Sequence, residues 1–170
     1  MTATLASAQE IPDFEQVVAV HGAAIGRVAA VHEKVKARRD ELVQEILLAV
    51  WQALSRFKGD SSLKTFVLRI AHHKSVDHVL KSRHDSKHQA FDESLVEPSA
   101  DTEQSVSLQQ RAERLLQAVQ RMPLAQRELV ALALEGCSHQ EIATIIGISA
   151  NNVAVRLSRA RQQLQHVMEP

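Results

Sequence analysis

Cysteine, tyrosine and long apolar runs are scarce or missing in this 170-residue chain. The single cysteine, Cys137, excludes an intramolecular disulfide and a zinc site built from several cysteines. Aromatic residues make up only 3% and none is tyrosine, so the core must consist mainly of Leu, Val, Ile and Ala, which suits packed helices. No stretch approaches about 18 consecutive apolar residues, and the first ten residues lack a signal-peptide pattern. These absences predict a reduced, cytoplasmic, all-α protein without membrane insertion.

The formal net charge is zero, but the charges are segregated along the sequence. Residues 61–90 contain six basic and two acidic residues, together with five histidines. Residues 91–103 contain five acidic residues and no basic one, and three arginines cluster at 156–161. The order basic, acidic, basic predicts two surfaces that face nucleic acid, joined by an acidic tether.

Apolar periodicity predicts three helices in the first half of the chain, at about residues 11–33, 39–57 and 63–82. The strongest signal is the stripe in the second helix, formed by Val43, Ile46, Leu47, Val50 and Leu54. Lys58-Gly59-Asp60 then ends that helix, and either Asp60 or Ser61 is expected to cap the next one.

Residues 84–106 are polar, acidic and aperiodic, and they include Pro98, so we expect a flexible linker. Helices are predicted again from about 107 to 122 and from 124 to 135, with Gly136 closing the second. Ser138 and Glu141 have the spacing of a capping box, which predicts a short helix to Ile146. A last helix is expected at about 150–166.

The segment from His139 to Arg159 has the spacing of a helix-turn-helix: small Ala143 where two helices cross, Gly147 in the turn and apolar Val153 on the second helix. The second helix of such a motif enters the major groove. Its predicted outward residues are Asn151, Asn152, Ala154, Val155, Ser158 and Arg159, with Arg156 and Arg161 placed to bind phosphates. The alternative is an ordinary helical hairpin with a solvated arginine face.

Three stretches, in the correct order, resemble the extracytoplasmic-function alternative sigma factors of bacterial RNA polymerase. Residues 57–71 resemble the promoter-melting segment, residues 40–46 followed by Trp51 resemble the polymerase-docking helix, and the helix-turn-helix with residues 156–161 resembles the second DNA-binding domain. The resemblance implies two small helical domains, 1–83 and 107–170, joined by the flexible acidic linker 84–106, with the helix-turn-helix in the C-terminal domain. It also implies a chain that binds core RNA polymerase and directs promoter-specific initiation.

The resemblance assigns roles to individual residues. Those expected to dock on the clamp helices of the polymerase large subunit are Asp40, Glu41, Gln44 and Glu45. Those expected at the minus-ten element are Phe57, Ser61, Ser62, Lys64, Arg69, His73, Lys74 and Asp77. The residues expected at the minus-thirty-five element are the eight outward and phosphate-binding residues of the last helix. Trp51 is expected in the core or at the edge of the polymerase interface, and the linker either threads the polymerase cleft or is a plain tether.

The chain departs from the family where stacking rings are common, since Leu63 and Leu68 replace aromatics and Phe66 stands where Trp is frequent. With few rings to stack on unpaired bases, we expect strict dependence on a good minus-ten sequence.

Two other classes of protein remain open. A helix-turn-helix regulator that binds DNA without polymerase would explain the C-terminal half but not the docking-like helix. A metal enzyme could use His72 and His73 with Asp77 and His78, or His84 with His88. We expect no catalysis, no cofactor and no metal. Many members of the family are held inactive by an anti-sigma protein, which makes such a protein a candidate partner.

Overall fold

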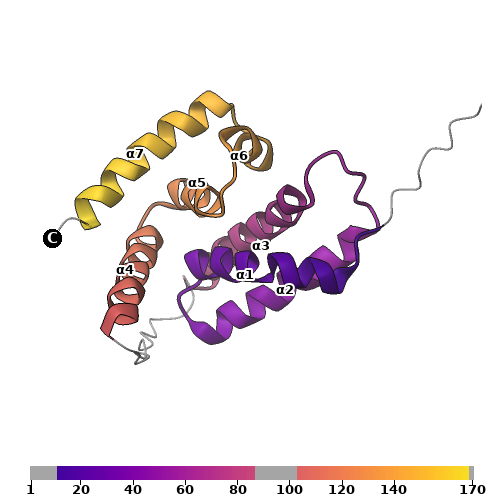
Figure 1. The fold of residues 1–170 in the computed structure, drawn as a ribbon, viewed down its shortest axis with the longest axis horizontal. Helices are drawn as coiled ribbons and strands as arrows, with labels where there is room; N and C mark the ends of the chain where they lie inside the picture. The colour runs from indigo at the N-terminus through magenta and orange to yellow at the C-terminus, as the bar shows by residue number, and fades with distance from the viewer. Residues whose placement is uncertain (1–10, 87–102, 169–170) are drawn as a thin grey trace, which may run out of the picture.

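A computed structural model describes residues 11–86 and 103–168, and these residues form seven α-helices and no strand (Figure 1). The first three helices are α1 (Phe14–His32), α2 (Lys36–Leu54) and α3 (Leu63–Ser86). The other four are α4 (Glu103–Gln120), α5 (Leu124–Leu134), α6 (His139–Ile146) and α7 (Ala150–Met168). The predicted all-α class is therefore confirmed. We call α1–α3 the N-terminal domain and α4–α7 the C-terminal domain.

The N-terminal domain is an α-helical bundle in which α1 packs against both α2 and α3. Its core is aliphatic, with Ile25, Ile46 and Val67 fully buried. Helix α1 is long and apolar enough to cross a membrane. Seven of its residues are buried against the protein, however, so its apolar character serves the core here.

In the C-terminal domain, α7 crosses α4, α5 and α6 and holds them together. The fully buried side chains at this crossing include Val119, Leu132, Ile142 and Val153. A short helix such as α6 is stable only because its apolar face is buried in this way.

Helix boundaries differ from the sequence predictions at several points. Helix α2 ends at Leu54 rather than at 57. Helix α3 is capped by neither Asp60 nor Ser61, because the Ser62 hydroxyl accepts the backbone N–H of Thr65 at 3.1 Å. Helices α3 and α4 both extend into the range 84–106 predicted as linker, and residues 87–102 of that range lie outside the described residues.

The two domains contact each other directly. Helix α1 packs on α4 and α5, and α3 packs on α5 and α6. The buried apolar residues of both domains form one continuous cluster. The N-terminal part of α3, which carries predicted promoter contacts, is thereby placed against the helix-turn-helix.

Candidate polymerase and nucleic-acid interfaces

The turn between α6 and α7 has the geometry of a helix-turn-helix. Both bonds of the capping box are formed: the Glu141 N–H donates to Ser138 Oγ at 3.2 Å, and the Ser138 N–H donates to Glu141 Oε2 at 2.7 Å. Gly147 ends α6 in the left-handed region, at φ 82°, and its N–H donates to the Ala143 carbonyl at 2.8 Å. Only glycine adopts this conformation without strain, so the turn depends on Gly147.

Helix α7 presents one face to the core and the other to solvent. Its buried residues are Val153, Leu157 and Ala160. The predicted DNA-contact residues lie elsewhere on the helix. Two of them, Asn152 and Ala154, are half-buried. The exposed ones are Asn151, Val155, Arg156, Ser158, Arg159 and Arg161. Arg156 Nε donates to Asn152 Oδ1 at 2.8 Å, which orients that guanidinium along the helix. All eight residues thus lie on one helix, and its three arginines are exposed to solvent.

Helix α2 carries the predicted docking residues on its solvent face. Asp40, Glu41, Gln44 and Glu45 are all exposed, whereas the opposite stripe of Leu42, Ile46, Val50 and Leu54 is buried. Lys36 Nζ lies 3.2 Å from Asp40 Oδ2, an exposed pair one turn apart.

The same face continues into two exposed apolar side chains, Leu48 (54% exposed) and Trp51 (58% exposed). The core alternative for Trp51 is therefore wrong. Sequence reasoning missed Leu48, although its position four residues after Gln44 is the signal that places it on the docking face. An acidic and amide patch bordered by exposed large apolar groups is typical of a protein interface rather than a solvated helix.

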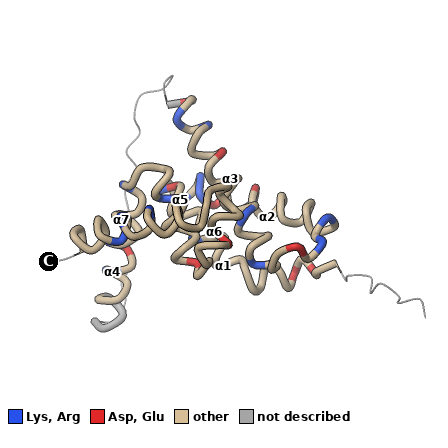
Figure 2. Tube along the Cα trace, turned by 90° about the horizontal axis from the view of Figure 1, so that it is seen from above, with Lys and Arg blue, Asp and Glu red and all other residues tan. Residues whose placement is uncertain are grey.

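The predicted minus-ten residues fall on the loop before α3 and along α3. Three of them, Ser62, His73 and Asp77, are exposed. The half-buried ones are Ser61, Lys64, Arg69 and Lys74. Arg69, His73 and Asp77 succeed one another at intervals of one helical turn, so they share one side of α3. Lys and Arg positions, blue in Figure 2, occur on α3 and α7 and also on other helices, α2 among them.

Phe57 differs from the rest of this set because its ring is already engaged. It packs on Phe66 with the ring centroids 4.9 Å apart and tilted by 58°. Leu68 is only 1% exposed and belongs to the core, so it offers no surface to a base. In the structure, too, this segment offers few aromatic rings on which an unpaired base could stack.

Two histidines are buried between α1 and α3. Burial lowers the pKa of His32 to about 4 and that of His72 to about 4, so both rings are neutral at pH 7. His32 Nδ1 lies 2.8 Å from the Val28 carbonyl, while His78 Nε2 lies 2.7 Å from Glu33 Oε2.

The histidines proposed as metal ligands do not converge where the structure describes them. Within residues 11–86 and 103–168, no three His, Cys, Asp or Glu side chains are arranged to hold a metal ion. His72 is buried while His73 faces solvent, and His88 lies outside the described residues. Cys137 is buried too, and its burial raises the pKa of the thiol, which leaves it protonated and unreactive.

Comparisons with known proteins agree with this arrangement. The family profile "Sigma-70 region 2" matches residues 18–84, and "Sigma-70, region 4" matches residues 112–164. The RNA polymerase sigma factor NccH of Alcaligenes xylosoxydans xylosoxydans is 30% identical over 92% of this chain and 87% of its own length. CnrH of Cupriavidus metallidurans is 26% identical over 92% and 86%.

The fold is shared with a solved relative. RpoE of Bartonella quintana, crystallised with the anti-sigma factor NepR, superposes with a TM-score of 0.74 at 22% identity, covering 92% of this chain and 96% of the other.

An exposed acidic helix, a basic helix and a helix-turn-helix follow one another along the chain, and this arrangement is that of a transcription initiation subunit. The chain belongs to the extracytoplasmic-function sigma factors, and it directs promoter-specific transcription by RNA polymerase.

Proposed function

We propose that α2 is the surface through which this sigma factor docks on core RNA polymerase. The observation that supports this most is the combination on one exposed face of Asp40, Glu41, Gln44 and Glu45 with Leu48 and Trp51. Carboxylates can pair with Lys and Arg of the polymerase clamp helices, while the two apolar side chains supply the buried area that ion pairs at a surface do not.

The loop at 57–62 and α3 then open and read the minus-ten element. Removing a base from the stack costs a few kcal/mol, so it needs a closed pocket. Ser61 and Ser62 would contribute hydroxyls to that pocket, and Phe57 its wall rather than a stacking surface. Arg69, His73 and Asp77 would face the bases. Lys64 and Lys74 would hold phosphates, which position the strand without reading it.

Helix α7 reads the minus-thirty-five element in the major groove. Arg159 would donate to guanine, and Ala154 and Val155 would contact thymine methyl groups. Asn151, Asn152 and Ser158 would contact base edges. Arg156 and Arg161 would hold the flanking phosphates, with Arg156 oriented by its bond to Asn152.

The protein performs no chemistry of its own in this scheme and acts in the cytoplasm, where the polymerase is. We assign polymerase docking and the minus-ten element to residues 1–83 and the minus-thirty-five element to residues 107–170, and the ends of α3 and α4 run into the acidic linker, 84–106, that joins them. An anti-sigma protein is also proposed as a partner, because the solved relatives CnrH and RpoE were captured with CnrY and NepR.

The test is run-off transcription with purified core polymerase on fragmented genomic DNA, with the sigma factor added or omitted. Specific transcripts that require the protein are the expected result. Absence of transcripts together with failure to co-elute with core polymerase would contradict the proposal.

Docking is tested with Asp40→Ala combined with Glu45→Ala, and separately with Leu48→Ala combined with Trp51→Ala. Both pairs are expected to weaken polymerase binding at least tenfold, roughly 1.4 kcal/mol or more, while helicity is unchanged. The matched control removes two exposed carboxylates elsewhere, Glu15→Ala with Glu113→Ala, and should bind as the parent does. Equal weakening in the control would remove the assignment to α2.

A further inference from the structure

Residues 33–39, which form the turn between α1 and α2 and the start of α2, sort their charges by exposure. The only carboxylate, that of Glu33, is buried: its Oε1 accepts the Val35 backbone N–H at 2.8 Å, and its Oε2 lies 2.7 Å from His78 Nε2 on α3. The basic residues that are exposed are Lys34, Lys36 and Arg38. Glu33 thus shapes the turn and fixes it to α3, while the charge that faces solvent is positive.

The positive surface of this turn continues onto α3. His78, which contacts Glu33, lies three positions before Lys81, and side chains at this spacing share one side of a helix. Lys81 is exposed, and Lys34 follows Glu33 directly in the sequence. The turn, the start of α2 and α3 therefore contribute one exposed cation each around the same contact. We call Lys34, Arg38 and Lys81 the basic surface.

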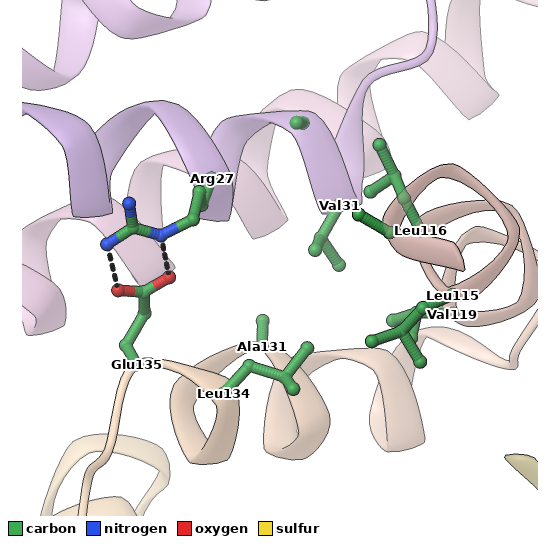
Figure 3. Close-up of a pocket in the computed structure, with 10 residues that line it drawn as sticks. Arg27, Val31, Leu115, Leu116, Val119, Ala131, Leu134 and Glu135 are labelled. Carbon is green, nitrogen blue, oxygen red and sulfur yellow. Dashed lines mark hydrogen bonds and ion pairs between the residues drawn. The ribbon is translucent and has the colours of Figure 1, made fainter. Parts of the chain in front are cut away.

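Arg27, elsewhere in the N-terminal domain, shows how a basic group is neutralised in this protein. It donates from Nε and Nη2 to the two carboxylate oxygens of Glu135, both at 2.8 Å (Figure 3). This ion pair lies at one end of an apolar groove of about 350 Å³ between α1, α4 and α5, which Val31 and Leu116 border. Its charge is already matched, so it needs no anionic partner.

The basic surface lacks such matching groups. Lys36 Nζ lies 3.2 Å from Asp40 Oδ2, but no carboxylate within residues 11–86 and 103–168 pairs with Lys34, Arg38 or Lys81. Helix α2 also has no acidic residue in its first turn, and its dipole repels cations at that end. The fold itself therefore gains nothing from these charges, whereas an anionic partner would.

The place of the basic surface along α3 favours DNA as that partner. The loop proposed to open the minus-ten element precedes α3, the base-reading positions up to Asp77 follow, and Lys81 lies beyond them. From Leu63 to Lys81 the helix rises by about 27 Å at ~1.5 Å per residue, which equals the length of about eight base pairs at ~3.4 Å each. The chain beyond α3 leads to the domain proposed to read the minus-thirty-five element. The basic surface would therefore meet duplex DNA between the two elements.

We propose that Lys34, Arg38 and Lys81 bind phosphates of the promoter duplex within about eight base pairs upstream of the opened bases. The inference rests on the proposed function, because it extends the same DNA surface to a turn that carries no base-reading residue. Contacts of Lys and Arg to phosphates position a duplex without reading its sequence. The turn between α1 and α2 therefore adds the same affinity at every promoter and holds the duplex against α3.

The experiment measures the affinity of the holoenzyme for a promoter fragment from the run-off assay while the salt concentration is raised. The test variant combines Lys34→Gln, Arg38→Gln and Lys81→Gln. Each lost phosphate contact should reduce the slope of log affinity against log salt by about 0.9, so the slope should fall by about 2–3 in this variant. Its preference for a matched over a mismatched promoter should equal that of the parent.

Two control variants match the glutamine variant, and circular dichroism checks the helicity of all three. The first keeps every charge and should keep the slope of the parent; it combines Lys34→Arg, Arg38→Lys and Lys81→Arg. The second removes three exposed charges from α4 and should also keep that slope; it combines Arg111→Gln, Arg114→Gln and Arg121→Gln. An unchanged slope in the glutamine variant, or an equal fall in the α4 control, would overturn the proposal.

Neutral methylphosphonate linkages, placed one at a time upstream of the minus-ten element, locate the contact. At a phosphate that the basic surface binds, the neutral linkage should weaken binding of the parent but not of the glutamine variant, because both changes remove the same interaction. Equal weakening of the two proteins at every position would refute the assignment. A glutamine variant that binds core polymerase more weakly in the absence of DNA would also refute it, since the surface would then belong to the docking face.

Failure of the parent holoenzyme to bind any promoter would overturn the proposed function rather than this inference. The free full-length chain with a random-sequence duplex of about 30 base pairs then provides the test, because phosphate contacts need no particular sequence. The glutamine variant should again show the smaller salt slope, and equal slopes for variant and parent would reject the basic surface as a DNA contact.

Discussion

Two glycines of this protein should respond to alanine with opposite signs. Gly147 lies at φ 82° in the turn of the helix-turn-helix, whereas Gly26 lies within α1 in a helical conformation. A Cβ added at either position would meet no heavy atom within 4 Å. Steric clash is thereby removed from the comparison, and backbone conformation alone decides the result.

The magnitudes follow from the backbone. Gly147→Ala must hold an L-residue in the left-handed region, which costs about 1–2 kcal/mol. Gly26→Ala reduces the freedom of the unfolded chain and favours the helix, for a gain of about 0.5–1 kcal/mol. For a chain of this size, each kcal/mol shifts the melting temperature by roughly 2–4 °C. Gly147→Ala should therefore lower it by about 2–8 °C, and Gly26→Ala should raise it by about 1–4 °C.

The assay is thermal and urea unfolding followed by circular dichroism, with Gly147→Asn as the matched variant. Asparagine tolerates the left-handed region better than alanine does, so the stability of Gly147→Asn should lie between that of Gly147→Ala and that of the parent. If Gly147→Ala is as stable as the parent, or if the two alanine variants shift stability in the same direction, the conformational argument is refuted.

Three further outcomes are expected. Arg159→Ala should lose about 1–3 kcal/mol of discrimination among minus-thirty-five sequences, measured by competition binding of the holoenzyme, and unchanged discrimination would exclude a base contact. As pH falls from 6.5 towards 4, the unfolded chain takes up protons that the buried rings of His32 and His72 do not, so the free energy of unfolding should decrease by about 3 kcal/mol for each ring. Above about pH 6.5 this loss is absent. In urea titrations across this pH range, His72→Gln should remove the part of the loss that is due to His72. A free energy of unfolding that falls with pH as steeply as in the parent would contradict the assignment. Finally, because the tilted rings of Phe57 and Phe66 pack against each other, a mismatched minus-ten element should sharply reduce open complexes detected by permanganate reactivity, and equal opening on both templates would count against this.

Local signals in the sequence predicted the helix-turn-helix well. The capping box of Ser138 and Glu141 and the turn at Gly147 depend on residues only a few positions apart, and the structure forms each as expected. The apolar stripe of α2 was equally readable, because helical periodicity directly reports which face is buried.

Other features depended on choices that local sequence does not decide. Ser62 rather than Asp60 or Ser61 caps α3, because three consecutive polar residues can each cap and the packing of Leu63 selects one. The sequence did not decide whether Trp51 is exposed, because an aromatic ring suits a core and an interface alike.

The pairing of Arg27 with Glu135 could not be predicted at all. It joins residues 108 positions apart, and their proximity depends on how two complete domains meet. Sequence patterns report the faces of single helices, not the relative placement of two folded units.

Covalent connection changes how weak the contact between the domains can be. Two sites on one chain with a short connection experience an effective concentration of about 1 mM. An interface whose dissociation constant is as poor as about 0.1 mM would then still be closed in roughly nine molecules out of ten. The groove beside Val31 and Leu116 can therefore stay open to solvent, because the shared backbone keeps the two domains near each other even where the packing between them is loose.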